Sequence, residues 1–256
     1  MKIWFLGTCA GTEPFADRKH ASFAVECDER IYWFDAGEGC SYTAHLAGLD
    51  LLAVKKIVIS HPHMDHVGGL GNLLWNIRKL TYMKKQNPRH SDIEVYIPCM
   101  ETWEGIMKIL RNTEEGFKTD FAITASLTVD GVLFDDGILK VTAYHNSHLR
   151  QQCAPWTSFS FLIEHAGKKL VYSGDVGSYH DLDELIGEGC DGLIIETGHF
   201  GVDAVYDYCK EKSIGKVFFF HNGREILNNK EGSLQKISRL FGESALITED
   251  GMSVYL

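Results

Sequence analysis

Short apolar runs, each bounded by turn residues, recur along the chain and predict most of its secondary structure. β-branched and aromatic residues dominate the runs at 22–27 and 30–34, and Asp28-Glu29 lies between them, which predicts a hairpin. The predicted strands are 2–6, 22–27, 30–34, 56–60, 93–97, three runs within 119–145, 159–164, 169–173, 192–195, 217–220, 245–247 and 252–255. Helical spacing predicts helices at 40–47, from about 66 to 79, and at 102–110, 181–186, 202–212 and 232–240.

Hairpins mixed with β-α units, without a strict βαβ period, indicate an α/β architecture with mixed sheets. No internal repeat, low-complexity tract or linker interrupts the pattern. We therefore expect residues 1–256 to form a single domain.

Composition narrows the function classes. The formal net charge of −10 disfavours broad non-specific binding to nucleic acid, which needs a basic surface. No segment reaches the about 20 apolar residues of a membrane span, and the first apolar run is too short for a secretory signal. We therefore expect a cytoplasmic protein with no membrane partner. The seven cysteines include no Cys-x-x-Cys pair and are expected to be free thiols.

Four metal-capable side chains lie within six residues, between a predicted strand and a predicted helix. They are His61, His63, Asp65 and His66. Rigid elements on both sides are what a metal site needs to hold its ligands in place. Imidazole and carboxylate ligands suit zinc, and also manganese or iron. On an extended loop His61 and His63 can reach one ion, while Asp65 and His66 can reach a second.

One loop does not complete two metal sites, so further ligands must come from elsewhere. Three later positions share its context, a polar group just past an apolar strand: His148, Asp175 and His221. We expect these residues to complete the ligand set. His145, three residues before His148, is the alternative third histidine.

The His-x-His-x-Asp-His motif at 61–66, with these later residues, resembles the metallo-β-lactamase fold hydrolases. Segments 6–8, 35–39 and 173–175 extend the resemblance over almost the whole chain. The resemblance implies a four-layer αββα sandwich, with two mixed sheets flanked by helices and the site at one edge of the sheets.

The resemblance also implies two divalent metal ions, with zinc preferred and manganese or iron as alternatives. One ion would take His61, His63 and His148, the other would take Asp65, His66 and His221, and Asp175 would bridge them. Asp35 would support the ligand loop by orienting its imidazoles. The position of His148 several residues past the strand end at 141–143 favours it over His145, which would then be a strand-edge histidine.

Two departures from other branches of the family narrow the resemblance. Asp175 stands where true β-lactamases of this class carry Cys, and an Asp there is the usual pattern of the glyoxalase II, lactonase and phosphodiesterase branches. His63 stands where the di-iron oxygen reductases carry Glu, which disfavours a redox role. Segments 6–11 and 34–39 resemble the branch that holds tRNase Z and the small cyclic-phosphate diesterases. Gly198-His199 resembles a tRNase Z Gly-His whose histidine helps protonate the leaving group, although His199 can also be read as a residue near the start of a helix.

We therefore expect a dinuclear metal-dependent hydrolase, a phosphodiesterase that acts on a small or cyclic phosphodiester. A metal-bridging hydroxide would attack phosphorus, Asp65 would hold it in line, and His199 would protonate the departing alkoxide. A thioester or lactone hydrolase on the same site is one alternative. A non-catalytic metal-binding protein is the alternative of another class.

Residues 149–174 are too few to include the long arm with which tRNase Z grips tRNA. Together with the acidic net charge, this predicts a small-molecule phosphodiester as substrate and makes tRNA unexpected. Arg150, Gln151, Gln152 and Trp156 either line a substrate pocket or form a solvated loop. The oligomeric state stays open, with a homodimer among the arrangements considered.

Overall fold

The computed structural model describes residues 1–90 and 92–256, and its strands form two sheets. The strands are β1 (Lys2–Gly7), β2 (Ser22–Cys27), β3 (Arg30–Phe34), β4 (Val54–Val58), β5 (Ile93–Ile97), β6 (Ile123–Leu127), β7 (Gly131–Asp135), β8 (Lys140–His145), β9 (Phe159–His165), β10 (Lys168–Tyr172), β11 (Cys190–Thr197), β12 (Ile214–Asn222), β13 (Ala245–Ile247) and β14 (Ser253–Tyr255). The first sheet has the order β14-β1-β2-β3-β4-β5-β6, and the second has the order β13-β12-β11-β10-β9-β8-β7. Each sheet contains both antiparallel and parallel pairs.

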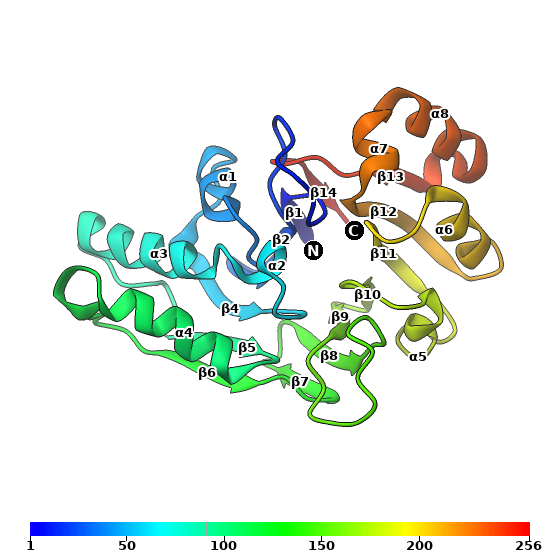
Figure 1. The fold of residues 1–256 in the computed structure, drawn as a ribbon. Coiled ribbons are helices and arrows are strands. Elements are labelled where there is room, and N and C mark those ends of the chain that lie inside the picture. Colours follow the sequence, from blue (N-terminus) through cyan, green and yellow to red (C-terminus); the bar gives the residue numbers. More distant parts are fainter. Residues whose placement is uncertain (91) are drawn as a thin grey trace.

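Helices flank the two sheets on both sides (Figure 1). They are α1 (Cys40–Leu46), α2 (Met64–Val67), α3 (Leu70–Lys84), α4 (Met100–Arg111), α5 (Asp183–Ile186), α6 (Val202–Cys209), α7 (Arg224–Asn228) and α8 (Lys230–Phe241), with short 3-10 turns η1 (Leu51–Ala53), η2 (Glu114–Gly116), η3 (Tyr179–Leu182) and η4 (Gly242–Ser244). Helices α1, α3 and α4 cover the first sheet, and α5, α6 and α8 cover the second. This is the αββα sandwich that the sequence predicted.

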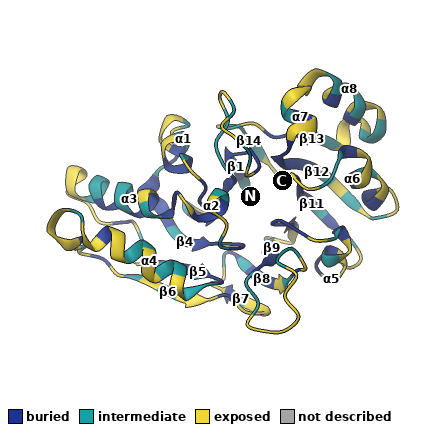
Figure 2. Cartoon of the chain, in the orientation of Figure 1, coloured by how far each residue is buried: buried dark blue, intermediate teal, exposed yellow. Residues whose placement is uncertain are grey.

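Three apolar cores separate the four layers, because successive strand residues point to opposite faces. Trp33 packs toward the helices of the first sheet, whereas Tyr32 and Phe34 pack between the sheets. In the second sheet, Phe218 packs between the sheets and Phe219 packs toward the outer helices. Figure 2 shows the same division, with buried residues on the inner faces of the helices and exposed residues outside.

The structure departs from the predicted helices at two places. The helix expected from about 66 to 79 is two helices, α2 and α3, which are interrupted at Gly68-Gly69. Glycine lowers helix stability by about 1 kcal/mol relative to alanine, and the interruption leaves α2 as a single turn that carries part of the metal motif. Helix α7 was not predicted, because five residues are too few to show helical periodicity.

The topology gathers the loops of the metal motif at one edge of the sandwich. Strands β10, β11 and β12 run parallel, so their carboxyl ends lie at the same edge of the second sheet. A parallel bridge from Cys9 to Asn222 links the loop after β1 to the end of β12, which joins the two sheets at this edge. Polar residues that end these strands therefore meet in space.

Two expectations from composition concern the cysteines and the membrane. All seven cysteines are free, and five of them are buried, which confirms the prediction of free thiols. None of the helices in 1–90 and 92–256 combines the length and the apolar character needed to cross a bilayer.

Candidate metal centre and active site

All seven predicted ligands lie together at this edge, in two groups that share Asp175. The first group is His61, His63, His148 and Asp175, and the second is Asp65, His66, Asp175 and His221. Within each group, one nitrogen or oxygen atom of every residue lies within 4.8 Å of the others. Each group thus offers four ligand atoms, which is the number that a tetrahedral zinc site takes.

Different elements deliver these side chains. His61 and His63 lie in the loop after β4, and Asp65 and His66 form the single turn α2. His148 and Asp175 follow β8 and β10 by three residues each. The site therefore depends on the register of both sheets.

His221 was expected just past its strand but lies within β12, at a β-bulge. Glu196 pairs with Phe220 while Thr197 pairs with Asn222, so His221 is the extra residue, and its φ of 46° is left-handed. A bulge re-aims a side chain, and here it turns the imidazole into the cluster. Gly198 leaves space for that ring, because a Cβ at 198 would lie 2.6 Å from His221 Nδ1.

The two carboxylate oxygens of Asp175 face different groups. Its Oδ2 lies 3.8 Å from His61 Nε2 and 3.9 Å from His148 Nε2. Its Oδ1 lies 3.3 Å from His66 Nε2 and 3.4 Å from His221 Nδ1. A carboxylate in this position can bind two ions, one through each oxygen.

Buried polar atoms without a partner show that this cluster fits metal ions. Of the described residues, six have a buried side-chain nitrogen or oxygen with no hydrogen-bond partner, and four of these atoms belong to the cluster. They are His61 Nε2, His66 Nε2, Asp175 Oδ1 and His221 Nδ1. Leaving such groups unpaired costs about 1–3 kcal/mol each, and cations between them would satisfy all four.

Asp35 holds the ligand loop from behind. Its Oδ1 accepts from Ser60 N (2.6 Å), and its Oδ2 accepts from Ser60 Oγ (2.7 Å) and Tyr172 Oη (2.5 Å). His66 Nδ1 lies 2.7 Å from the same Oδ2, so the carboxylate accepts a hydrogen bond from the Nδ1–H and leaves Nε2 facing the cluster. This contact is the support that the resemblance implied for Asp35.

Electrostatics make the cluster attractive to cations. Burial keeps the pKa of His61 well below its usual range, so that its ring is neutral. Burial opposes charge on His66 as well, but Asp175 and Asp35 raise the pKa of His66 well above its usual range. Burial also opposes charge on His221, but Asp175 and Asp65 outweigh it and raise the pKa of His221 to about 9. Although burial acts against it, the neighbouring histidines hold the pKa of Asp175 well below its usual range.

The structure shows different surroundings for His148 and His145. His148 Nε2 lies 3.3 Å from His63 Nδ1, inside the first group. His145 instead stacks on Trp156, with ring centroids 4.1 Å apart, and its Nδ1 lies 2.7 Å from an Asp130 oxygen. The geometry thus favours His148, as expected, and gives His145 a role in holding the loop to the end of β8.

His199 lies at the site and not at a helix cap. It is two residues before Gly201, the residue that caps α6, and its ring centroid lies 4.9 Å from that of His148. Its Nδ1 lies 3.0 Å from Glu196 Oε1, and its backbone N–H donates to the other carboxylate oxygen of Glu196. Chiefly through this hydrogen bond, Glu196 raises the pKa of His199.

Glu196 is a functional candidate that sequence reasoning missed. It is fully buried at the end of β11, and with His199 and His221 it forms a third group of metal-capable atoms. Burial opposes its charge, but the hydrogen bond with His199 lowers its pKa. A glutamate that ends an apolar strand, three residues before His199, was the signal in the sequence.

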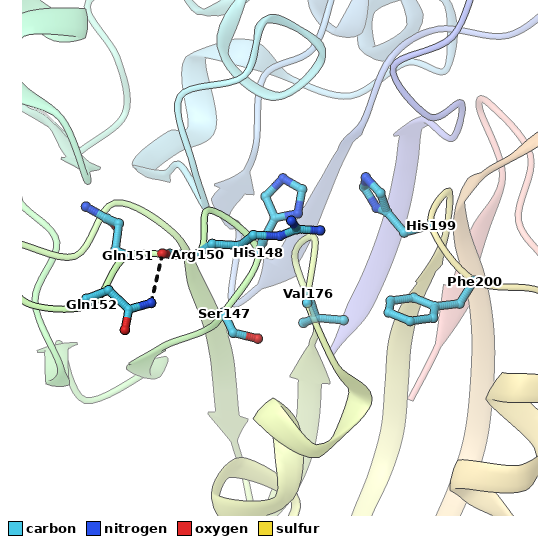
Figure 3. Close-up of a pocket in the computed structure, with 9 residues that line it drawn as sticks. Ser147, His148, Arg150, Gln151, Gln152, Val176, His199 and Phe200 are labelled. Carbon is cyan, nitrogen blue, oxygen red and sulfur yellow. Dashed lines mark hydrogen bonds between the residues drawn. The ribbon is translucent and has the colours of Figure 1, made fainter.

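A cavity of about 690 Å³ adjoins the open side of the cluster. His61, His66 and Asp175 are buried, whereas His148 and His199 line the cavity (Figure 3). Its other lining residues are Ser147, Arg150, Gln151, Gln152, Val176, Gly177 and Phe200. Three of the four loop residues left open by the sequence thus border the cavity, and Trp156 is the exception.

A family profile described as Anti-Pycsar protein Apyc1 matches residues 1–198. The chain belongs to this family. The matched stretch carries six of the seven predicted ligands, all except His221.

Two proteins named ribonuclease Z are similar to this chain, one over part of its length and one over nearly all of it. The ribonuclease Z of Methanothermobacter thermautotrophicus is 30% identical over 150 residues, which are 58% of this chain but only 45% of that enzyme. The ribonuclease Z of Picrophilus torridus is 23% identical over 301 aligned residues, covering 97% of this chain and 94% of that enzyme.

Solved structures share the fold over nearly their full length. Human tRNase Z, short form, has a TM-score of 0.74 at 20% identity, covering 100% of this chain and 99% of that one. Zn(2+)-bound PqqB from Methylobacterium extorquens has a TM-score of 0.70 at 17% identity, covering 100% of both chains. A diphosphatase of the PhnP family has a TM-score of 0.68 at 15% identity, covering 100% of this chain and 97% of that one. The chain thus has the metallo-β-lactamase fold that the resemblance implied, and proteins similar to it are named ribonuclease Z, tRNase Z and diphosphatase, as expected for the branch of that resemblance.

These relatives contradict the expectation that tRNA is not a substrate. Proteins named ribonuclease Z match up to nearly the whole chain, and a tRNase Z has the same fold. The expectation was wrong because a net charge of −10 describes the whole surface, whereas a substrate meets only the local field at the site. The short segment between His148 and Asp175 removes one means of gripping RNA but leaves the cluster of ligand residues in place.

Proposed function

We propose that this protein is a phosphodiesterase that holds two divalent metal ions, with zinc preferred, and hydrolyses small or cyclic phosphodiesters. One observation carries the proposal: two groups of ligand atoms share a carboxylate whose two oxygens face opposite groups. His61, His63 and His148 would hold one ion, Asp65, His66 and His221 would hold the other, and Asp175 would bind both.

The chemistry follows from this ligand set. When bound, two divalent ions lower the pKa of a water molecule and offset the negative charge on the phosphate oxygens. Water gives up a proton to solvent and adds to phosphorus through a new P–O bond, and the P–O bond to the alkoxide breaks. Asp65 orients the attacking water. The alkoxide needs a proton, and we assign its delivery to His199. The contact of His199 Nδ1 with Glu196 supports this role, because it leaves Nε2 for the substrate.

The size of the cavity supports a small substrate. Pockets of about 300–1,000 Å³ hold small molecules, and a cavity of about 690 Å³ can accept a mononucleotide-sized ligand. Between His148 and Asp175 the chain forms one loop and the β9–β10 hairpin. The ribonuclease Z relatives support a second candidate, cleavage of RNA, which uses the same phosphodiester chemistry.

A substrate panel tests the proposal. The zinc-loaded protein is assayed with bis-p-nitrophenyl phosphate, 2′,3′- and 3′,5′-cyclic mononucleotides, an RNA with a 3′ extension, a thioester and a lactone, each with and without a chelator. We expect hydrolysis of the small or cyclic diesters, lost with chelator and restored by zinc. If the RNA is cleaved faster than the small diesters, RNA is the substrate and the second candidate function holds. If the fully metallated protein hydrolyses only the thioester or lactone, or nothing, the proposed phosphodiesterase function is wrong.

A further inference from the structure

One positive side chain stands at the edge of a carboxylate-rich site. Arg150 is the sole lysine or arginine among the residues that line the cavity beside the ligand groups. The described residues supply no hydrogen bond or ion pair to its guanidinium, and its backbone N–H donates to Ser147 O at 3.0 Å. By contrast, the guanidinium groups of Arg18 and Arg78 bond to neighbouring residues. The charge of Arg150 is therefore available to a ligand.

The loop beneath this side chain is firmly held. Ser147 donates to Asp181 Oδ2 through both its N–H, at 3.0 Å, and its Oγ, at 2.7 Å. Gln151 Oε1 accepts from the N–H and the hydroxyl of Thr157, at 2.7 and 2.8 Å, and its Nε2 donates to Pro155 O. These bonds fix the backbone on both sides of residue 150, so that little ordering of the loop is needed when a ligand binds.

The loop that carries Arg150 packs against the loop that follows Asp175. A Cβ on Gly177 would lie 2.4 Å from Ser147 Oγ, so the loop after Asp175 packs directly on the base of the arginine loop. In Figure 3 the Arg150 side chain extends from this base toward the gap between His148 and His199. The guanidinium therefore faces the space next to the ligand groups.

The backbone at Arg150 is unfavourable for a long side chain. Its φ of 52° lies in the left-handed region, where glycine and asparagine are accommodated more readily than arginine. An arginine held in such a conformation, at a cavity and without a partner in the protein, indicates a role outside the folding of the loop. An anion in the cavity would supply the missing partner.

We propose that Arg150 binds a phosphate oxygen of the substrate and stabilises the charge that grows on the phosphoryl group during hydrolysis. This inference rests on the proposed phosphodiesterase function. A diester carries one negative charge and its monoester product carries nearly two, so a fixed cation binds the later stages of the reaction more strongly. The planar guanidinium also offers paired N–H donors that match two phosphate oxygens, which a lysine ammonium does not.

Two variants of residue 150 separate charge from folding. Arg150→Asn removes the charge and suits the left-handed backbone, and Arg150→Lys keeps the charge without the paired donors. Arg239→Gln, an exposed position of α8, removes the same charge far from the cavity and serves as the control. Zinc content and Tm are measured for every variant, and we expect both to match the wild type.

Activity on bis-p-nitrophenyl phosphate and binding of inorganic phosphate to the zinc-loaded protein, measured by calorimetry, are the two readouts. Loss of one charge-assisted contact corresponds to about a 10- to 30-fold effect. We expect Arg150→Asn to lower kcat/KM and to weaken phosphate binding by this factor, Arg150→Lys to recover part of both, and Arg239→Gln to change neither by more than about twofold.

The two readouts keep this inference distinct from the proposed function. An active wild type whose Arg150→Asn variant is equally active, or equally good at binding phosphate, overturns the role of Arg150. If the wild type is inactive but binds phosphate through Arg150, the proposed phosphodiesterase function is wrong and phosphate binding by Arg150 stands. A wild type that binds no phosphate overturns the inference itself.

Discussion

A substitution of Asp35 tests how the ligand loop is held. The Asp35 carboxylate is fully buried and accepts hydrogen bonds from Ser60, Tyr172 and His66. Asp35→Asn keeps the shape but replaces one oxygen by an NH₂ donor. If the NH₂ occupies the Oδ2 position it faces three donors, and if it occupies the Oδ1 position it faces the Ser60 N–H. Either orientation loses the charge and creates at least one donor–donor contact.

The size of the effect follows from these bonds. Hydrogen bonds to a charged group contribute about 1.5–3 kcal/mol each, and the amide oxygen preserves part of the set. We therefore expect the free energy of unfolding of the metal-free protein to fall by about 3 kcal/mol. Because His66 loses the partner that orients it, we also expect zinc affinity to fall about 10- to 100-fold.

Denaturant unfolding of the metal-free variant and zinc titration against a competing chelator measure the two effects. Tyr172→Phe removes a single donor and should lower the free energy of unfolding by about 1 kcal/mol. The exposed Asp120→Asn removes the same charge elsewhere and should change neither quantity. A zinc affinity of Asp35→Asn within twofold of the wild type would show that Asp35 does not orient the ligand loop.

Substitutions of three histidines and of Glu196 test the roles assigned to these residues at the site. His148→Ala should lose about one equivalent of bound zinc by elemental analysis, whereas His145→Ala should keep both, since His145 packs on Trp156; equal zinc loss in both variants would contradict this assignment. His199→Ala should lower kcat about 10²- to 10⁴-fold with zinc content unchanged. Normal turnover by this variant would show that His199 does not protonate the departing alkoxide. Glu196→Gln should lower kcat by a smaller factor, because it weakens only the hydrogen bond that holds His199, and a loss of zinc would instead make Glu196 a ligand.

Local patterns predicted the fold well where strands are short and apolar. The hairpin of 22–27 and 30–34 and the loop at 61–66 lie where the sequence placed them, because turn residues and alternating burial act over a few residues. The layered arrangement of two sheets came from the resemblance, since periodicity does not show which strands pair at long range.

Features that depend on long-range packing could not be predicted. The bulge at His221 arises from the register between β11 and β12, and the contact of Glu196 with His199 depends on how the loop after β11 turns back. The hydrogen bonds around Asp35 join residues up to 137 positions apart. The substrate inference failed for a similar reason, because net charge carries no information on where charges lie.

Anomalous diffraction at the zinc edge, from crystals grown with zinc, tests whether two metal ions share Asp175. We expect two peaks, one against His61, His63 and His148 and one against Asp65, His66 and His221, with Asp175 touching both. A single peak, or a second peak held instead by Glu196, His199 and His221, would contradict it.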